Sequence, residues 1–148
     1  FLTTWYRAWP QTMSVDMQQW TQLHNVRDEV NKAIELTRQQ GAIGSGLMAE
    51  VTLYADASLL ALLEKLGDEL RFLLITAKTK VLPLEEKPHD LITHAELKLA
   101  VDINASTYPK CARCWHRCAE VGEIVNHPEL CQRCVGNITG TAEQRTFA

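Results

Sequence analysis

The chain has 148 residues, which is enough for one or two small domains with their own hydrophobic cores. Hydrophobic residues make up 46% and charged residues 22%, as in ordinary globular proteins, and no segment approaches the ~20 apolar residues of a membrane span. The net charge of -3 argues against a protein that coats nucleic acid through a diffuse positive field, so such contacts would need individually placed Arg and Lys side chains.

The N-terminal part predicts an aromatic segment followed by one long helix. Trp5, Tyr6 and Trp9 lie within residues 1–13, and the first residue is Phe, so we expect a fragment of a longer protein. From about residue 14 to residue 40 apolar side chains recur every three to four positions, which is typical of an amphipathic helix. Its length favours packing in a helical bundle outside this chain. The stripe consists of Met17, Trp20, Leu23, Val26, Val30, Ala33 and Ile34, with Ser14 or Asp16 as a start and Gly41 as an end.

The middle of the chain changes to alternating patterns that predict strands. Residues 47–55, 73–81 and 96–103 each alternate apolar and polar side chains, which is typical of half-buried strands. A helical pattern fills residues 57–70, and a proline-containing loop fills residues 83–89. We therefore predict an α+β fold with a long helix and a small three-stranded sheet with a helix. The predicted divisions are a helical part at 1–45, an α/β domain at 46–106 and a metal module at 107–148.

Two Cys-x-x-Cys pairs near the end of the chain predict a metal site. Cys111 and Cys114 form the first pair, and Cys131 and Cys134 form the second, sixteen residues later. Each pair can place two thiolates on one tight turn, and two such turns supply the four ligands of a tetrahedral Zn²⁺ site. Because a module of about forty residues has few large apolar side chains, bound zinc would provide much of its folding free energy.

Other uses of these cysteines fit the sequence less well. Two disulfides would need an oxidising compartment, and the N-terminus has no export signal. Four thiolate ligands leave no open position for a catalytic water, so the predicted zinc is structural. Cys118 is interpreted as a free thiol, packed or exposed, or as a substitute ligand, and His116 and His127 as weaker candidates for a mixed site.

Basic and aromatic residues surround the cysteine pairs. Arginine side chains can bind phosphate through two hydrogen bonds, and an exposed tryptophan can stack on a base. The alternatives are that the basic residues form a solvated surface and that Trp115 fills the small core of the module. The candidate nucleic-acid-binding residues are Lys110, Arg113, Trp115, His116, Arg117, Arg133 and Arg145.

The motifs together resemble the C-terminal part of bacterial isoleucyl-tRNA synthetase. The resemblance rests on residues 110–116 (KCARCWH), residues 131–137 (CQRCVGN), Gly140 and residues 143–148 (EQRTFA). Upstream, residues 26–35 (VRDEVNKAIE), residues 43–47 (IGSGL) and residues 68–71 (DELR) are similar to the same family. The resemblance spans nearly the whole chain and is most specific in the cysteine-rich end.

The resemblance implies a class I aminoacyl-tRNA synthetase that is cytoplasmic and monomeric. In that family the full enzyme activates isoleucine with ATP, transfers it to tRNA and edits valine. This chain contains neither the His-Ile-Gly-His nor the Lys-Met-Ser-Lys-Ser signature, so ATP and Mg²⁺ would bind in a catalytic domain outside it. The part present here would end the anticodon-binding domain and place a zinc finger on the anticodon arm of the tRNA, next to the other domains of the same enzyme.

Two alternatives remain at this stage. A DNA glycosylase of the formamidopyrimidine type carries a zinc finger with similar cysteine spacing, but it needs an N-terminal proline and a helical pair before the finger, and neither pattern is present. A zinc clip that joins two domains without touching nucleic acid would use the same four cysteines.

Overall fold

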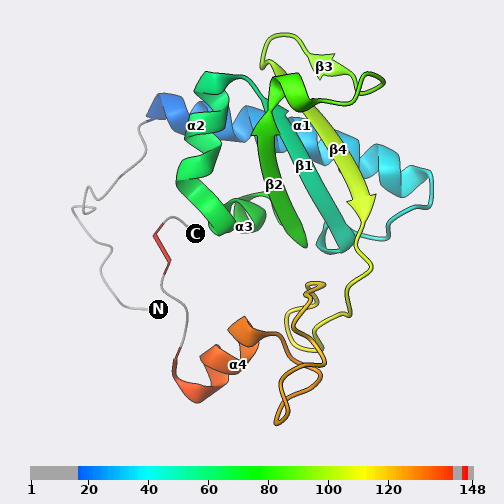
Figure 1. Ribbon diagram of the computed structural model, residues 1–148, viewed down its shortest axis with the longest axis vertical. Helices are drawn as coiled ribbons and strands as arrows, with labels where there is room; N and C mark the ends of the chain where they lie inside the picture. The colour runs from blue at the N-terminus through cyan, green and yellow to red at the C-terminus, as the bar shows by residue number, and fades with distance from the viewer. Residues whose placement is uncertain (1–16, 142–144, 147–148) are drawn as a thin grey trace, which may run out of the picture.

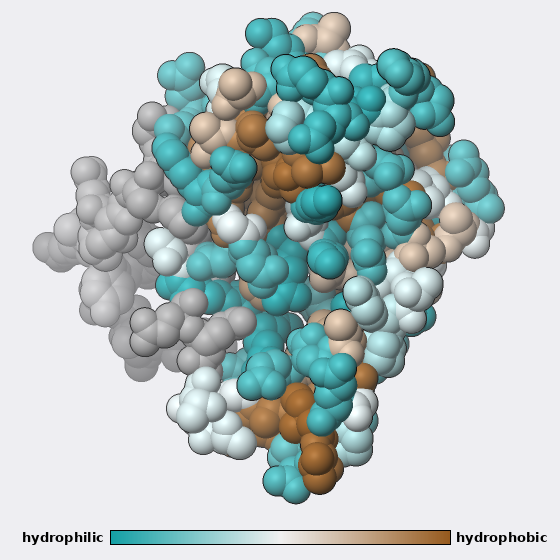
Figure 2. All heavy atoms as spheres, viewed as in Figure 1, coloured by the Kyte–Doolittle hydropathy of each residue, from teal (hydrophilic) through white to brown (hydrophobic). Residues whose placement is uncertain are grey.

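The computed structural model describes residues 17–141 and 145–146. An α/β layer lies above a smaller cysteine-rich module, and a single extended segment after β4 joins them (Figure 1). The space-filling view shows two lobes with mostly hydrophilic atoms where they meet (Figure 2). The aromatic segment at 1–13 and the caps Ser14 and Asp16 lie outside the described residues.

The sheet has four strands in the order β2-β1-β4-β3. β1 (Ala49–Ala55) and β2 (Lys78–Pro83) are parallel, and β4 (Leu99–Ala105) and β3 (Thr93–His94) each pair antiparallel with their neighbour. Parallel neighbours need a long crossover, and here α2 (Ala57–Leu66), a 3-10 turn (Gly67–Glu69) and α3 (Leu70–Leu74) supply it. The α+β class predicted from the sequence is confirmed.

The long helix α1 (Met17–Gln39) packs on this sheet and runs behind the strands in Figure 1. Leu23, Val26 and Val30 are fully buried and join one core cluster with the alternate residues of β1. We expected such a helix to belong to a bundle. Its buried stripe instead packs against the sheet, where apolar residues of β1 and β4 complete one hydrophobic core with it. Residues on both sides of the predicted boundary between 45 and 46 therefore share one core. The division of the chain into domains at that boundary stays a prediction.

Gly41 ends the long helix as predicted. Its φ of +79° is the left-handed conformation that glycine adopts without steric cost, and its N–H donates to the carbonyl of Arg38 at 2.9 Å. A further 3-10 turn (Gly46–Met48) then leads directly into β1.

Three boundaries of the sheet differ from the prediction. The predicted second strand at 73–81 is wrong at its start, because Leu70, Leu73 and Leu74 keep the helical spacing and place α3 there instead. The third predicted strand begins at Leu99, after a turn in which Lys98 has a φ of +48°. The sheet has one strand more than predicted, β3, which follows a 3-10 turn (Leu84–Glu86). It has only two residues and is too short to give an alternating pattern.

The linker between the layer and the module is fixed to the sheet at one residue. Ser106 is buried, its N–H donates to the carbonyl of Met48 at 2.8 Å, and its hydroxyl bonds to Glu50 at 2.7 Å. The module follows this point and contains one regular helix in the described residues, α4 (Gln132–Thr139). Over residues 17–141 and 145–146, no helix is long and apolar enough to span a bilayer.

Candidate metal centre and its surroundings

The four cysteines of the two pairs converge on one point. The sulfur atoms of Cys111, Cys114, Cys131 and Cys134 all lie within 4.8 Å of one another. Three of these residues are buried, and all four are free thiols. The Cys114 and Cys131 sulfurs are 3.6 Å apart, which is much longer than a disulfide. A tetrahedron with ~2.3 Å zinc–sulfur bonds has sulfur–sulfur edges of about 3.8 Å, so this spacing fits a four-thiolate zinc site.

Backbone hydrogen bonds shape the two turns that present these sulfurs. In the first, the N–H of Trp115 donates to the carbonyl of Cys111 at 3.0 Å, and the N–H of Cys111 donates to the carbonyl of His116 at 2.9 Å. The second turn begins α4, with Cys131 as its N-cap residue and Cys134 in its first turn. The N-terminal end of a helix carries partial positive charge, which favours thiolate there.

The protonation of the cysteines is consistent with a site built for a cation. Burial opposes a charge on Cys111, but backbone N–H groups of Cys114, Cys131 and Arg113 point at its sulfur and the pKa falls to about 6. Burial raises the pKa of Cys131 and of Cys134. Burial therefore disfavours the charged form of Cys131 and Cys134, and a divalent cation would supply the charge that stabilises their thiolates.

Cys118 packs beside the metal centre and does not complete it. Its side chain is 7% exposed and joins the small core of the module with Val121, Leu130 and the cysteines of the two pairs. Burial, followed by the nearby charges of Glu120 and Cys114, raises the pKa of the Cys118 thiol to about 11. Cys118 does lie close to Cys131 and Glu120, but neither His116 nor His127 joins a metal-like group in the described residues.

Trp115 is on the outside of the module. It is 60% exposed and does not fill the small core, so that alternative for this residue is wrong. Its φ of +68° is the left-handed conformation, which is unfavourable for a residue with a Cβ. The ammonium of Lys110 lies 4.9 Å from the centre of the indole ring, and Arg113 is exposed nearby with one guanidinium nitrogen 3.8 Å from the Cys134 sulfur. We call Lys110, Arg113 and Trp115 the outer group.

A second set of the predicted basic residues points inward, toward the α/β layer. The guanidinium groups of Arg133 and Arg145 lie 5.1 Å and 4.0 Å from the centre of the Phe72 ring, and the His116 ring meets Phe72 edge-on at 6.1 Å. Burial, and then the charges of Arg133 and Arg71, lower the pKa of His116. We call His116, Arg133 and Arg145 the inner group. Phe72 has no local signal in the sequence that marks it as functional, because it lies in a leucine-rich helix.

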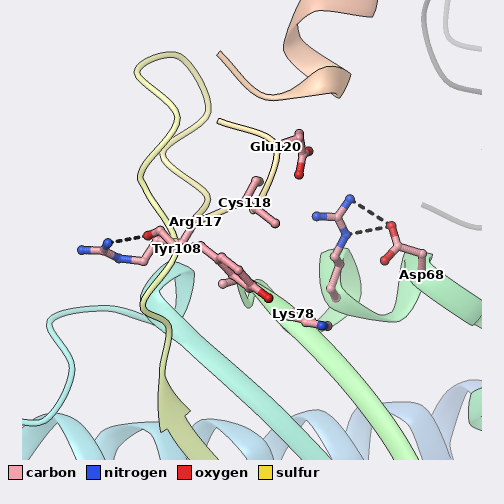
Figure 3. Close-up of a pocket in the computed structure, with 9 residues that line it drawn as sticks. Asp68, Lys78, Tyr108, Arg117, Cys118 and Glu120 are labelled. Atoms are coloured by element: carbon pink, nitrogen blue, oxygen red, sulfur yellow. Dashed lines mark hydrogen bonds and ion pairs between the residues drawn. The ribbon is translucent and has the colours of Figure 1, made fainter. Parts of the chain in front are cut away.

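Arg117 belongs to neither group. Its guanidinium donates to the carbonyl of Tyr108 at 2.7 Å, and the residue lines a cavity of about 320 Å³ between the module and the layer (Figure 3). Lys78, Tyr108, Cys118 and Asp68 line that cavity, and Asp68 is paired with Arg71 at 2.9 Å. The seven residues that were predicted to bind nucleic acid therefore do not form one surface.

Comparison with known proteins connects this geometry to one family. Residues 109–136 match the family described as "Zinc finger found in FPG and IleRS". The chain is 53% identical over 147 residues to the isoleucine--tRNA ligase of Legionella pneumophila (strain Lens), 48% over 150 residues to that of Coxiella burnetii (strain RSA 331 / Henzerling II) and 45% over 151 residues to that of Idiomarina loihiensis. These matches cover 99–100% of the chain and 16% of each relative.

The chain corresponds to a segment of isoleucine--tRNA ligases. This confirms the resemblance to bacterial isoleucyl-tRNA synthetase that the motifs indicated. The zinc-finger match alone names two families, whereas the matches over the whole chain are to isoleucine--tRNA ligases, which favours them over the glycosylase alternative. The zinc-finger match and the four-cysteine group together support zinc binding by this ligase segment.

Proposed function

We propose that this chain is the tRNA-positioning part of an isoleucine--tRNA ligase. The longer cytoplasmic enzyme, acting as a monomer, would attach isoleucine to its tRNA with ATP and Mg²⁺ bound in a domain outside this chain. The role assigned to the chain is to contact the anticodon arm, so that the distant 3′ end meets the active site. A contact far from the reacting bond raises the rate by fixing geometry and raising the effective concentration.

Cys111, Cys114, Cys131 and Cys134 are the proposed zinc ligands. Bound zinc supplies a closed four-coordinate centre without a position for substrate or water, so its role is structural. The ligand residues hold the two turns together, and the first turn carries the outer group on its exposed side. Bound zinc would hold the first turn in the conformation that exposes Trp115 to the tRNA, and it would take no part in the chemistry of the enzyme.

The observation that carries the RNA-binding proposal is the conformation of Trp115. A glycine would fit its left-handed backbone without strain, yet the position holds a large aromatic side chain that is 60% exposed and contributes little to the core. Strained residues with no packing benefit are typical of functional sites. An exposed ring with Lys110 at one face and Arg113 nearby fits stacking on a base beside backbone phosphates.

The replacement Trp115→Gly separates binding from stability. Removing the ring should weaken affinity for an isoleucine tRNA transcript by about 1–3 kcal/mol, roughly 5- to 150-fold, because one stacked base is lost. The same replacement should leave the zinc content unchanged and should not lower the free energy of unfolding, since it relieves the strained φ. Electrophoretic or fluorescence titration of the tRNA, together with thermal unfolding, measures both effects.

The control for this replacement is Trp115→Phe, which should retain most of the affinity because a stacking face remains. Affinity should also fall steeply with salt if Lys110 and Arg113 contact phosphates. Equal tRNA affinity in wild type, Trp115→Gly and Arg113→Ala would reject the proposal and favour a zinc clip that only joins domains.

A further inference from the structure

Phe72 collects cationic and aromatic groups from distant parts of the chain. Its ring, on the short helix α3, lies 4.5 Å from the guanidinium of Arg71, in addition to the contacts with Arg133, Arg145 and His116. The face of an aromatic ring attracts cations, and the attraction grows when water is excluded. One half-buried side chain of the α/β layer therefore meets all members of the inner group.

The partners of Phe72 are parts of the metal module and of the end of the chain. Arg133 lies between the two cysteines of the second pair, and although burial acts to lower it, the neighbouring sulfur of Cys114 raises the pKa of its guanidinium. The same side chain thus lies near a candidate zinc ligand and over the Phe72 ring. Near Arg145, the N–H of Thr146 donates to Glu69 at 2.6 Å, so this part of the chain lies beside α3 as well (Figure 1).

Two sets of contacts among the described residues tie the module to the layer. The first is the linker at Ser106, which is fixed to Met48 and Glu50. The second is the ring of Phe72. A cavity of about 320 Å³ lined by Lys78 of the layer and Cys118 of the module shows that the two parts are not densely packed against each other everywhere (Figure 3). A module fixed only at its linker can rotate about it, whereas a second contact sets its orientation.

We propose that Phe72 is a positioning residue that sets the orientation of the metal module on the α/β layer. Its aromatic face holds Arg133 and Arg145, and this fixes the direction in which Trp115 and the outer group point. The orientation follows from the contacts within this chain, and only its consequence for tRNA rests on the proposed function.

Residual dipolar couplings of the zinc-loaded chain test the orientation directly. In the wild type, couplings from residues 49–105 and from residues 109–139 should fit one alignment tensor, because the two parts tumble together. In Phe72→Ala the two sets should need separate tensors, with a smaller one for the module. A single unchanged tensor in Phe72→Ala would overturn the proposal. Zinc content and the amide spectrum of the sheet report whether each variant is folded.

Three further variants define what the ring contributes. Phe72→Tyr keeps the aromatic face and should retain one tensor, whereas Phe72→Leu keeps apolar volume without that face and should behave like Phe72→Ala. Leu73→Ala is the matched control on the same helix, because Leu73 packs on the core of the layer; it should lower stability and leave one tensor. A single tensor in Phe72→Leu would overturn the assignment of this role to the aromatic ring.

Binding of the tRNA transcript connects orientation to function. Phe72→Ala, with the outer group intact, should bind about tenfold more weakly, because a freely rotating module loses the geometric advantage of a fixed second contact. If the two alignment tensors separate in Phe72→Ala and Trp115→Gly binds tRNA like wild type, the positioning role stands and the proposed function fails. If a single tensor persists in Phe72→Ala while Trp115→Gly loses affinity for tRNA, the positioning role fails and the proposed function stands.

Discussion

At the scale of single residues, Ile75 and Trp115 occupy left-handed backbone for different reasons. Both have positive φ, 56° and 68°, although neither is glycine. Trp115 sits on a metal turn with its ring exposed, which motivates the RNA-binding proposal. Ile75 ends α3, and its N–H donates to the carbonyls of Arg71 and Phe72. The side chain of Ile75 is 52% exposed, so packing does not compensate for much of the backbone strain.

Replacing Ile75 with glycine should stabilise the α/β layer. The left-handed conformation costs a residue with a Cβ about 1–2 kcal/mol, and glycine removes this cost. The stabilisation is partly offset because glycine makes the unfolded chain more flexible. We expect Ile75→Gly to raise the free energy of unfolding by up to about 1 kcal/mol, measured by urea denaturation. Ile75→Ala is the control, because it removes the exposed side chain but keeps the Cβ. An equal gain in both variants would show that backbone strain is not the cause.

Neither conformation could be read from the sequence. Ile75 lies within residues that alternate apolar and polar, and this alternation placed the start of the predicted strand at residue 73 instead of Lys78. The alternation begins by chance inside a leucine-rich helix, and the helical spacing of Leu70, Leu73 and Leu74 determines the local structure. By contrast, Gly41 could be predicted as a helix end because glycine at such a position has a specific backbone reason.

At the scale of elements, the parallel pair of β1 and β2 depends on a crossover whose helices are well determined. Asp56 begins α2 as an N-cap, and its carboxylate accepts a hydrogen bond from the N–H of Leu59 at 3.1 Å. Leu59, Leu62, Leu63 and Leu66 then bury one face of the helix. The cap fixes where the chain leaves β1, and the leucine face fixes where it returns.

Loss of this cap should destabilise the layer without affecting the metal module. Asp56→Ala removes the side-chain acceptor for a helix N–H and should lower the free energy of unfolding by about 1 kcal/mol. Asp56→Ser is the control, because serine also caps helices and should recover most of the loss. The measurement is denaturant unfolding followed by far-ultraviolet circular dichroism, with the zinc content measured in parallel. No difference between Asp56→Ala and Asp56→Ser would argue against a capping role.

The sequence predicted elements with strong local patterns and missed those that depend on contacts between distant residues. The stripe of α1 predicted its buried residues Leu23, Val26 and Val30, but not that the sheet would cover them. The spacing of the two cysteine pairs predicted their convergence. The partition of the basic residues into an outer and an inner group depends on Phe72, which is 44 or more residues away from each partner in the inner group, so no local pattern could reveal it.

At the scale of the whole molecule, two lobes with different sources of stability are joined. The α/β layer has one continuous core that extends from α1 to β4. The module has a small core made mostly of cysteines, with Val121 and Leu130. Metal binding must supply the folding free energy that this core lacks. The chain spans 16% of the length of the relatives it matches.

Cobalt substitution tests the central claim that four thiolates hold one zinc ion and fold the module. We expect one Co²⁺ per chain with the absorption spectrum of a tetrahedral all-sulfur site. Cys131→Ser should change that spectrum and unfold residues 109–139 while the sheet remains folded, whereas Cys118→Ser should leave both unchanged. A spectrum of mixed or octahedral coordination in the wild type, or a spectrum that depends on Cys118 and not on Cys131, would contradict the account.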